Sequence, residues 1–411
     1  MTHFHQNHRW RLSGLFSDFV VPKLDWDENH GDEVQADVYG TFLSYQAGYN
    51  TLTIVPELLD SIYAFYDLPA TANRLYPSLK ERKGLASDAC EVSANLIELY
   101  QMANYLMVVG RFKTAAHLYQ HVASIIQFKE AHYNLGLCRM MSYLSTCNDP
   151  LSYPISIDSH IPLERTHGQQ NPQQILKSAQ RSFELVLEDY DKDYRHAKFA
   201  LIAIYGWQGN HEEAKSLISD LTTSVESSED PYFLLTLANH YIENSDMAQG
   251  EAIYRQLLSD LPGGHPLINS IQRNINLLDG NDPWPTFTPS IQNEQNLDGV
   301  TSLLFYSDYQ NEIAISQGVQ FARADQFGSV LSKLTGSHGK FHMQRIASKE
   351  IRTSEGLGIG SSLSELNNRW RDEHFIQVTH VGGQYVVLWS RGLIFKLDES
   401  LVTTEWVSFS L

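Results

Sequence analysis

The chain has few cysteines, few basic residues and no long apolar run, and each shortage excludes a class of protein. Its 411 residues include only three cysteines, Cys90, Cys138 and Cys147, none of them closely paired. This excludes a disulfide-rich secreted scaffold and favours a reducing compartment. No run of about 18 apolar residues is present, so no membrane-spanning helix is predicted. The first residues lack the basic-then-apolar order of a secretory signal, so we expect a cytoplasmic location.

Positive charge is also scarce. The chain carries 30 Lys and Arg against 48 Asp and Glu, a formal net charge of −18. Binding to nucleic acid or to anionic membranes requires a basic face, so neither is expected as the main partner. Residues 1–296 hold a net charge of −16 and residues 297–411 only −2, so the two parts differ in character.

The length and a proline-rich stretch predict a multidomain protein. Pro283, Pro285 and Pro289 lie within residues 280–299, which predicts an extended linker. Apolar residues recur at helical spacing before this linker, and alternating aromatic and β-branched runs follow it. The predicted parts are an N-terminal extension (1–90), helical repeats (91–279), the linker (280–299) and an α+β domain (300–411).

The helical part contains an internal repeat. Its apolar spacing predicts a helix over 55–66, two over 92–144 with a break at 109–111, one over 175–190, pairs over 194–221 and 231–262, and a terminal helix over 265–278. Small residues stand at equivalent places: Ala115, Ala179, Ala214 and Gly250. Each has a bulky residue four positions later, which suits close packing of one helix on the next. A proline-containing insertion without periodicity, 145–174, separates the two helices of one unit.

These features resemble the tetratricopeptide repeat over residues 96–144 and 175–262. Tyr133-Asn134-Leu135-Gly136 is similar to the opening of the family's consensus, and Pro262 is similar to its closing proline. The resemblance implies an all-α solenoid of helix pairs. The first helices of such a solenoid line a concave groove that binds a segment of a partner protein.

The C-terminal part is predicted to form a small α+β domain with an antiparallel sheet. We expect strands over 300–306, 341–346, 374–380, 384–390, 393–397 and 404–410, a helix over 322–334, and a helix capped by Ser362 and Glu365. The run from Thr353 through Gly356 and Gly360 to Leu366, with Gly392-Leu393-Ile394-Phe395, loosely resembles modules of bacterial envelope proteins and of the β-lactamase-inhibitor-protein type. That resemblance implies a bacterial chain, in which these residues build the fold rather than a catalytic site.

No catalytic, metal or cofactor motif is recognisable. The glycines of 356–360 lack the spacing and the following Lys-Ser/Thr of a phosphate-binding loop, and a turn with positive φ explains them better. Asp189, Asp191 and Asp193 begin like a calcium loop, but Tyr194 stands where glycine is required. No GxSxG or paired zinc-binding histidines occur. We therefore predict a protein that is not an enzyme and that has no metal and no cofactor.

The leading hypothesis is an adaptor that binds a partner segment in the concave groove. In the family's register the groove residues are Tyr100, Asn104, Tyr133, Met140, Phe199, Trp207, Tyr232, Asn239 and Glu243. Aromatic side chains with scattered amides and acids suit a basic or amphipathic peptide segment. Two alternatives stay open: an inhibitor or immunity protein that neutralises a toxin or hydrolase, and an enzyme with an unrecognised site in the C-terminal domain.

Overall fold

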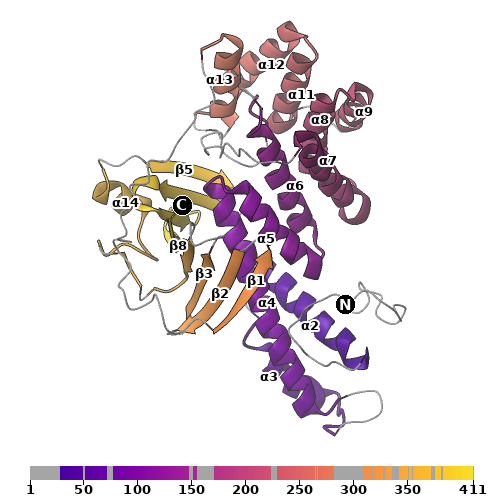
Figure 1. Ribbon diagram of the computed structural model, residues 1–411, viewed down its shortest axis with the longest axis vertical. Helices are drawn as coiled ribbons and strands as arrows, with labels where there is room; N and C mark the ends of the chain where they lie inside the picture. Colours follow the sequence, from indigo (N-terminus) through magenta and orange to yellow (C-terminus); the bar gives the residue numbers. More distant parts are fainter. Residues whose placement is uncertain are drawn as a thin grey trace. The chain divides into compact units, whose positions relative to one another are not determined.

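A computed structural model shows helices in the first part of the chain and an antiparallel sheet in the last part (Figure 1). The residues that it describes are 28–49, 51–71, 77–147, 151–154, 171–223, 229–263, 265, 267–281, 310–316, 319–326, 329–335, 342–349, 351–353, 355–371, 375–380 and 383–410. The predicted linker from residue 282 onward and the predicted strand over 300–306 lie outside them, as does most of the insertion.

Helices lie where the apolar spacing predicts them, and α2 and the first part of α4 add helices within the predicted N-terminal extension. They are α2 (Glu28–Gln46), α3 (Val55–Phe65), α4 (Leu79–Val108), α5 (Phe112–Ile125), α6 (Lys129–Leu144), α7 (Pro172–Leu185) with the π-helical turn η2 (Val186–Tyr190), α8 (Arg195–Gln208), α9 (His211–Thr222), α11 (Pro231–Glu243), α12 (Met247–Asp260) and α13 (Leu267–Leu278). The predicted breaks are confirmed at Gly110 and Gly209, whose φ angles are 72° and 75°. A further break between α5 and α6 was not predicted. Ile126 and Phe128 are both buried there, so the apolar pattern continues through the turn and hides it.

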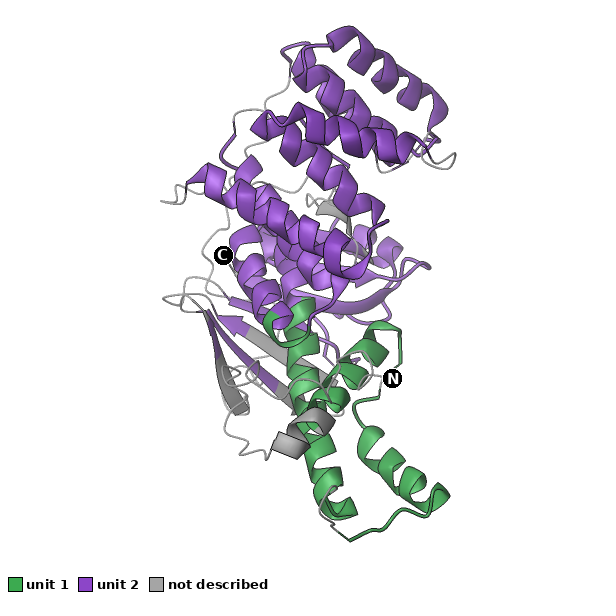
Figure 2. Cartoon of the chain, turned by 90° about the vertical axis from the view of Figure 1, so that its right-hand side faces the viewer, with its two compact units in different colours: residues 1–101, 124–126 green, residues 102–123, 127–411 purple. Residues whose placement is uncertain are grey.

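The chain forms two compact units (Figure 2). The first comprises residues 1–101 and 124–126, and the second residues 102–123 and 127–411. In the first unit, Asp37 of α2 forms an ion pair with Arg82 of α4, and Phe42 packs edge to face on Tyr100 with 6.3 Å between ring centroids. The predicted border at residue 90 lies inside α4, because this helix continues without a break to Val108.

In the second unit, helices pack on their neighbours in the chain. Contacts join α6 to α7, α8 to α9 and α11 to α12, and α8 lies between α7 and α11. The small residues at the repeated positions are all buried. A Cβ atom on Gly250 would come within 2.5 Å of Ile242 Cδ1, and one on Gly136 within 2.8 Å of the Phe183 ring. The predicted role of these small residues in close helix contacts is therefore confirmed at Gly250, and Gly136 makes a close contact of the same kind.

The sheet has eight described strands. They are β1 (Gln310–Ser316), β2 (Val319–Gln326), β3 (Ser329–Thr335), β4 (His342–Ile346), β5 (Phe375–His380), β6 (Gly383–Leu388), β7 (Leu393–Leu397) and β8 (Thr403–Ser410). Their order is β1-β2-β3-β4-β8-β7-β6-β5, and every neighbouring pair is antiparallel. Two consecutive four-stranded meanders are thus joined where their last strands, β4 and β8, pair. The prediction of an antiparallel sheet is confirmed.

One predicted helix of this domain is wrong. A helix was predicted over 322–334, but residues 322–326 lie in β2 and residues 329–334 in β3, and these strands pair over seven residue positions. Alanine, lysine and leucine in this stretch have high helix propensity, and pairing with neighbouring strands overrides that local preference. Strand β1 was not predicted, because its sequence QNEIAIS alternates too briefly to stand out.

The helix α14 (Leu363–Arg369) covers one face of the sheet. Ser362 and Glu365 form the predicted capping box, and Leu366 and Trp370 pack into a core with Phe395 and Trp406. Gly356 and Gly360 have φ angles of 80° and 89°, which confirms a turn that needs positive φ before this helix.

The opposite face of the sheet holds a buried ion cluster. Arg345 Nε donates to Glu405 Oε2 at 2.6 Å, and Lys396 Nζ lies 2.9 Å from Glu405 Oε1. Beside it, Tyr105 near the end of α4 packs edge to face on Tyr385 of β6, with ring centroids 5.6 Å apart. The last turns of α4 and this sheet are therefore packed together within one unit.

Candidate interaction site

The predicted groove residues are distributed over four helices, and most are buried. Tyr100 and Asn104 lie on α4, Tyr133 and Met140 on α6, Phe199 and Trp207 on α8, and Tyr232, Asn239 and Glu243 on α11. Tyr100 belongs to the first unit and the other eight to the second. Only Trp207, Tyr232 and Glu243 keep part of their surface exposed. The structure brings the predicted residues of α8 and α11 together, and a segment of the chain itself contacts them.

That segment is Leu151–Pro154, the described part of the insertion, which we call the resident segment. Its backbone is held by two asparagines. Asn274 of α13 accepts from the Ser152 N–H at 2.6 Å and donates to the Ser152 carbonyl at 2.9 Å. Asn239 of α11 donates to the same carbonyl at 2.8 Å. Both polar groups of one peptide residue are thus satisfied by side-chain carboxamides, a form of recognition that does not depend on the residue's side chain.

The two asparagines are fixed by further hydrogen bonds. Tyr254 of α12 donates from its hydroxyl to Asn239 Oδ1 at 2.5 Å, and Asn274 Nδ2 lies 3.0 Å from the same oxygen. Both asparagines are fully buried, so their orientations are set before any peptide group binds to them. Asn104 and Tyr119 form the same bond at 2.5 Å with the same separation of fifteen residues. The Asn–Tyr pair is therefore a recurring feature of the helix pairs.

The first three side chains of the resident segment each contact a different kind of group. Leu151 packs on the apolar cluster of α11 to α13, which includes Leu235 and Ile242. Arg273 Nη1 donates to the Ser152 hydroxyl at 2.7 Å. Tyr153, which is 5% exposed, packs edge to face on Trp207 with 5.1 Å between ring centroids.

A carboxyl group lies between Trp207 and Tyr153. The indole Nε1 of Trp207 donates to Glu243 Oε1 at 2.7 Å. Burial raises the pKa of Glu243 from 4.5 to about 7, although the Tyr153 hydroxyl and the indole oppose this shift. The backbone of α8 approaches closely here, since a Cβ atom on Gly206 would lie 2.7 Å from Glu243 Oε2. The site therefore presents a carboxyl group that is ready to accept a hydrogen bond from a hydroxyl.

Aromatic rings form a row near the starts of α6, α8, α11 and α13. Tyr133, His196, Tyr232 and His265 contact one another in this order, with centroid distances of 6.3, 6.2 and 6.2 Å. Burial and the charge of Arg195 lower the pKa of His196, while Asp230 opposes them. Two predicted groove residues, Tyr133 and Tyr232, thus pack in this row and stabilise the contact between helix pairs.

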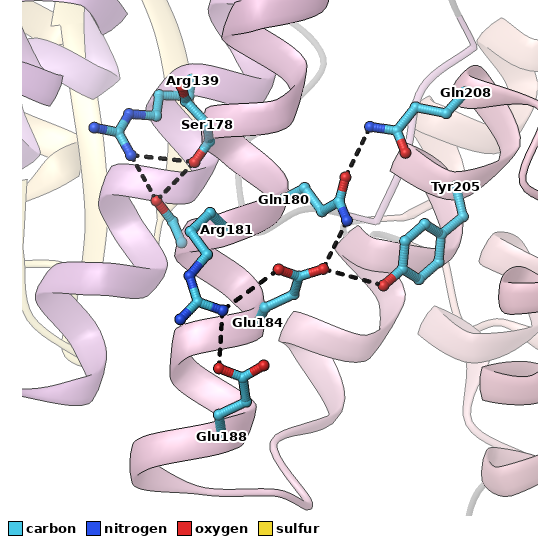
Figure 3. A network of polar contacts seen from close by, with 9 residues as sticks. Arg139, Ser178, Gln180, Arg181, Glu184, Glu188, Tyr205 and Gln208 are labelled. Carbon is cyan, nitrogen blue, oxygen red and sulfur yellow. Dashed lines mark hydrogen bonds and ion pairs between the residues drawn. The ribbon is translucent and has the colours of Figure 1, made fainter.

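A separate polar network joins α6, α7 and α8 (Figure 3). Arg139 Nη1 donates to the Ser182 hydroxyl at 2.8 Å, Gln208 donates to Gln180 at 2.9 Å, and Tyr205 donates to Glu184 at 3.4 Å. No contact of the described residues links this network to the resident segment. Tyr205 and Glu184 are, like Tyr153 and Glu243, a tyrosine close to a glutamate. A substitution of Tyr205 can therefore serve as a control for substitutions at the resident segment and its contacts.

Tyr143 also belongs to the site, since its ring lies 5.4 Å from that of Trp207 between centroids. Several contact residues were not predicted, namely Tyr143, Ser152, Tyr153, Arg273 and Asn274. Asn274 could have been found, because it follows Asn239 by 35 residues, the period of the repeat. The others have no such signal. Among the residues described, no group of three or more His, Cys, Asp or Glu side chains is arranged to hold a metal ion.

The chain has no match among protein-family models, characterised proteins or solved structures. None of the described helices combines the length and apolar character that crossing a bilayer requires.

Proposed function

We propose that the helical part is a non-enzymatic interaction module of the tetratricopeptide type, which binds an extended segment of a partner protein at α11 and α13. The observation that carries the proposal is the double hydrogen bond of Asn274 to the Ser152 backbone, reinforced by Asn239. An arrangement that satisfies both the N–H and the C=O of one residue can hold a peptide backbone of any origin.

The repeat architecture supports this proposal. Small buried residues recur with a period of 35 or 36 residues, and the Asn–Tyr hydrogen bond occurs in two helix pairs. Stacked helix pairs with such a period are the design of solenoids that bind peptides along their first helices. The net charge of −16 before residue 297 favours a basic or amphipathic partner through electrostatic attraction.

The test is to select peptides on the full-length chain from a random display library and to measure their affinities for variants. Asn274→Ala should weaken every selected peptide by at least about tenfold, because buried peptide groups then lose their partners. Tyr205→Phe, which removes a tyrosine–glutamate bond of the network in Figure 3, should leave the affinities unchanged.

Two outcomes would overturn the proposal. One is that no peptide is selected. The other is that peptides bind equally to the wild type and to Asn274→Ala, which would place binding elsewhere. Binding that maps to the sheet would then favour the inhibitor hypothesis over the adaptor.

A further inference from the structure

The resident segment has the contacts expected of a ligand, although it belongs to the chain. Its main-chain groups are held by side chains of α11 and α13, 87 and 122 residues away in sequence. Leu151, Ser152 and Tyr153 each meet a different chemical environment, and Ser152 and Tyr153 are only 3% and 5% exposed. A loop that merely connected α6 to α7 would not need side-chain contacts of this kind with α11 and α13.

We propose that Leu151–Pro154 is a resident pseudo-ligand, and that the partner is an extended peptide with the pattern apolar–Ser–Tyr–Pro, which binds by displacing it. The inference rests on the proposed function and adds to it the sequence class of the partner and a built-in competitor.

Each position of the pattern follows from a contact. The apolar residue is required by the cluster that packs on Leu151. A small hydroxyl residue fits the second position, since Arg273 donates to the Ser152 hydroxyl and Ser152 is only 3% exposed. Tyrosine at the third position provides a ring for Trp207 and places a hydroxyl near Glu243.

Proline suits the fourth position for a different reason. Pro154 is buried, and a proline has no N–H group that would need a hydrogen-bond partner there. It also restricts the preceding residue to an extended backbone, which keeps Tyr153 in line with Ser152.

The competition is intramolecular. A segment tethered by a loop reaches its site at an effective concentration in the millimolar range, so a free peptide binds only when the segment is displaced. The apparent dissociation constant of the free peptide equals the intrinsic constant divided by the fraction of molecules in which the site is free. A partner that carried this pattern would therefore bind weakly until the resident segment was released.

The experiment uses the full chain and a fluorescent peptide with the sequence of residues 148–157, NDPLSYPISI. In one variant, residues 149–155 are replaced by seven glycine and serine residues. Fluorescence anisotropy should show that this variant binds the peptide at least about tenfold more tightly than the wild type does. Adding Asn274→Ala to the variant should abolish binding, whereas adding Tyr205→Phe should not change it.

The peptide itself supplies the controls for specificity. A scrambled sequence should not bind, and the peptide substitutions Leu151→Ala and Tyr153→Ala should each weaken binding by about tenfold or more. Equal affinity of the native and scrambled peptides would overturn the pattern. If library peptides bound through Asn274 without this pattern, the interaction function would stand and this inference would fail.

A single substitution tests whether the segment is a displaceable ligand or only a structural part of the fold. Tyr153→Ala in the full chain keeps the loop but loses the contacts with Trp207 and Glu243, so the free peptide should bind it more tightly than the wild type. The peptide should also raise the melting temperature of the glycine-serine variant. If the peptide neither binds more tightly to Tyr153→Ala nor stabilises the glycine-serine variant, the segment is only part of the fold and the proposal is wrong.

Discussion

At the scale of single residues, two asparagines make the same bond but differ in what else they hold. Asn104 accepts from Tyr119, while Asn239 accepts from Tyr254 and also donates to the Ser152 carbonyl. Asn239→Ala should cost about 1–3 kcal/mol more in the free energy of unfolding than Asn104→Ala, because it removes two further buried hydrogen bonds, those with the Ser152 carbonyl and with Asn274. Urea denaturation of the two variants measures this difference. Equal losses would show that the contact with the segment contributes nothing.

The carboxyl group of Glu243 predicts a pH dependence. Burial raises its pKa from 4.5 to about 7, with the nearby Tyr153 hydroxyl and the hydrogen bond from Trp207 opposing the shift. Because the folded state binds this proton more tightly than the unfolded state, the contribution to stability is greatest below pH 4.5 and is lost as the pH rises to about 7. Glu243→Gln should remove this decline, as thermal melts between pH 4.5 and 7.5 would show. A decline as steep as that of the wild type would assign it to another group.

The sequence predicted some residues of the site and could not predict others. Trp207, Asn239 and Glu243 were found because the repeat register places them on the first helices of their units. Ser152 and Tyr153 could not be found, since they lie in a stretch without periodicity and contact residues far away in sequence. The sequence also did not predict that most of the groove residues are buried. The repeat register shows which face of a helix a side chain occupies, but not which other segment of the chain covers that face.

At the scale of helices, the small residues of the repeat are the firmest prediction. Ala214 of α9 is fully buried in a cluster with Phe199 and Ile202 of α8. Ala214→Trp should lower the free energy of unfolding by about 1–3 kcal/mol or more, because a larger side chain forces the two helices apart. Ala252→Trp, on the exposed surface of α12, is the matched control and should have little effect. Similar melting of both variants would contradict the close contact of α8 and α9.

At the scale of strands, Glu405 joins β4, β7 and β8 through Arg345 and Lys396. Burial alone would raise the pKa of Glu405, but the two cations outweigh it and lower the pKa from 4.5 to about 2. This group therefore stabilises the fold above pH 4.5, and the contribution is lost as the pH falls to about 2. Glu405→Gln should cost about 3–5 kcal/mol at pH 7 and less at pH 3, measured by denaturant unfolding. An equal cost at both pH values would exclude the ion cluster as the cause.

At the scale of the whole molecule, the sequence predicted the change from helices to sheet. It did not predict that the end of α4 packs against the sheet. The change in apolar spacing near residue 280 is a local signal, and it was confirmed by the element order. The contact of Tyr105 with Tyr385 joins residues 280 positions apart, and no local pattern could show it. Residues 102–123 and 127–411 accordingly form one compact unit.

That contact leads to a prediction about proteolysis. Proline-containing segments without apolar periodicity are preferred cleavage sites, so limited proteolysis should cut within residues 280–299 and within the predicted insertion 145–174. The fragments should nevertheless elute together in gel filtration, because α4 and β6 stay in contact through Tyr105 and Tyr385.

The variant Tyr105→Ala tests whether the fragments stay together through the tyrosine contact once the chain has been cut. It should be cut at the same sites as the wild type, since the linker is unchanged, but its C-terminal fragment should elute separately after the cut. Tyr153→Ala is the matched control, because it removes another buried tyrosine of the helical part, one that packs on Trp207 and not on the sheet, and its fragments should stay together. Fragments of the wild type that separate on cleavage would show that the sheet is held by the linker alone. Fragments that stay together in Tyr105→Ala would show instead that the neighbouring contacts of α4 suffice, and that the tyrosine pair is not what joins the helical part to the sheet.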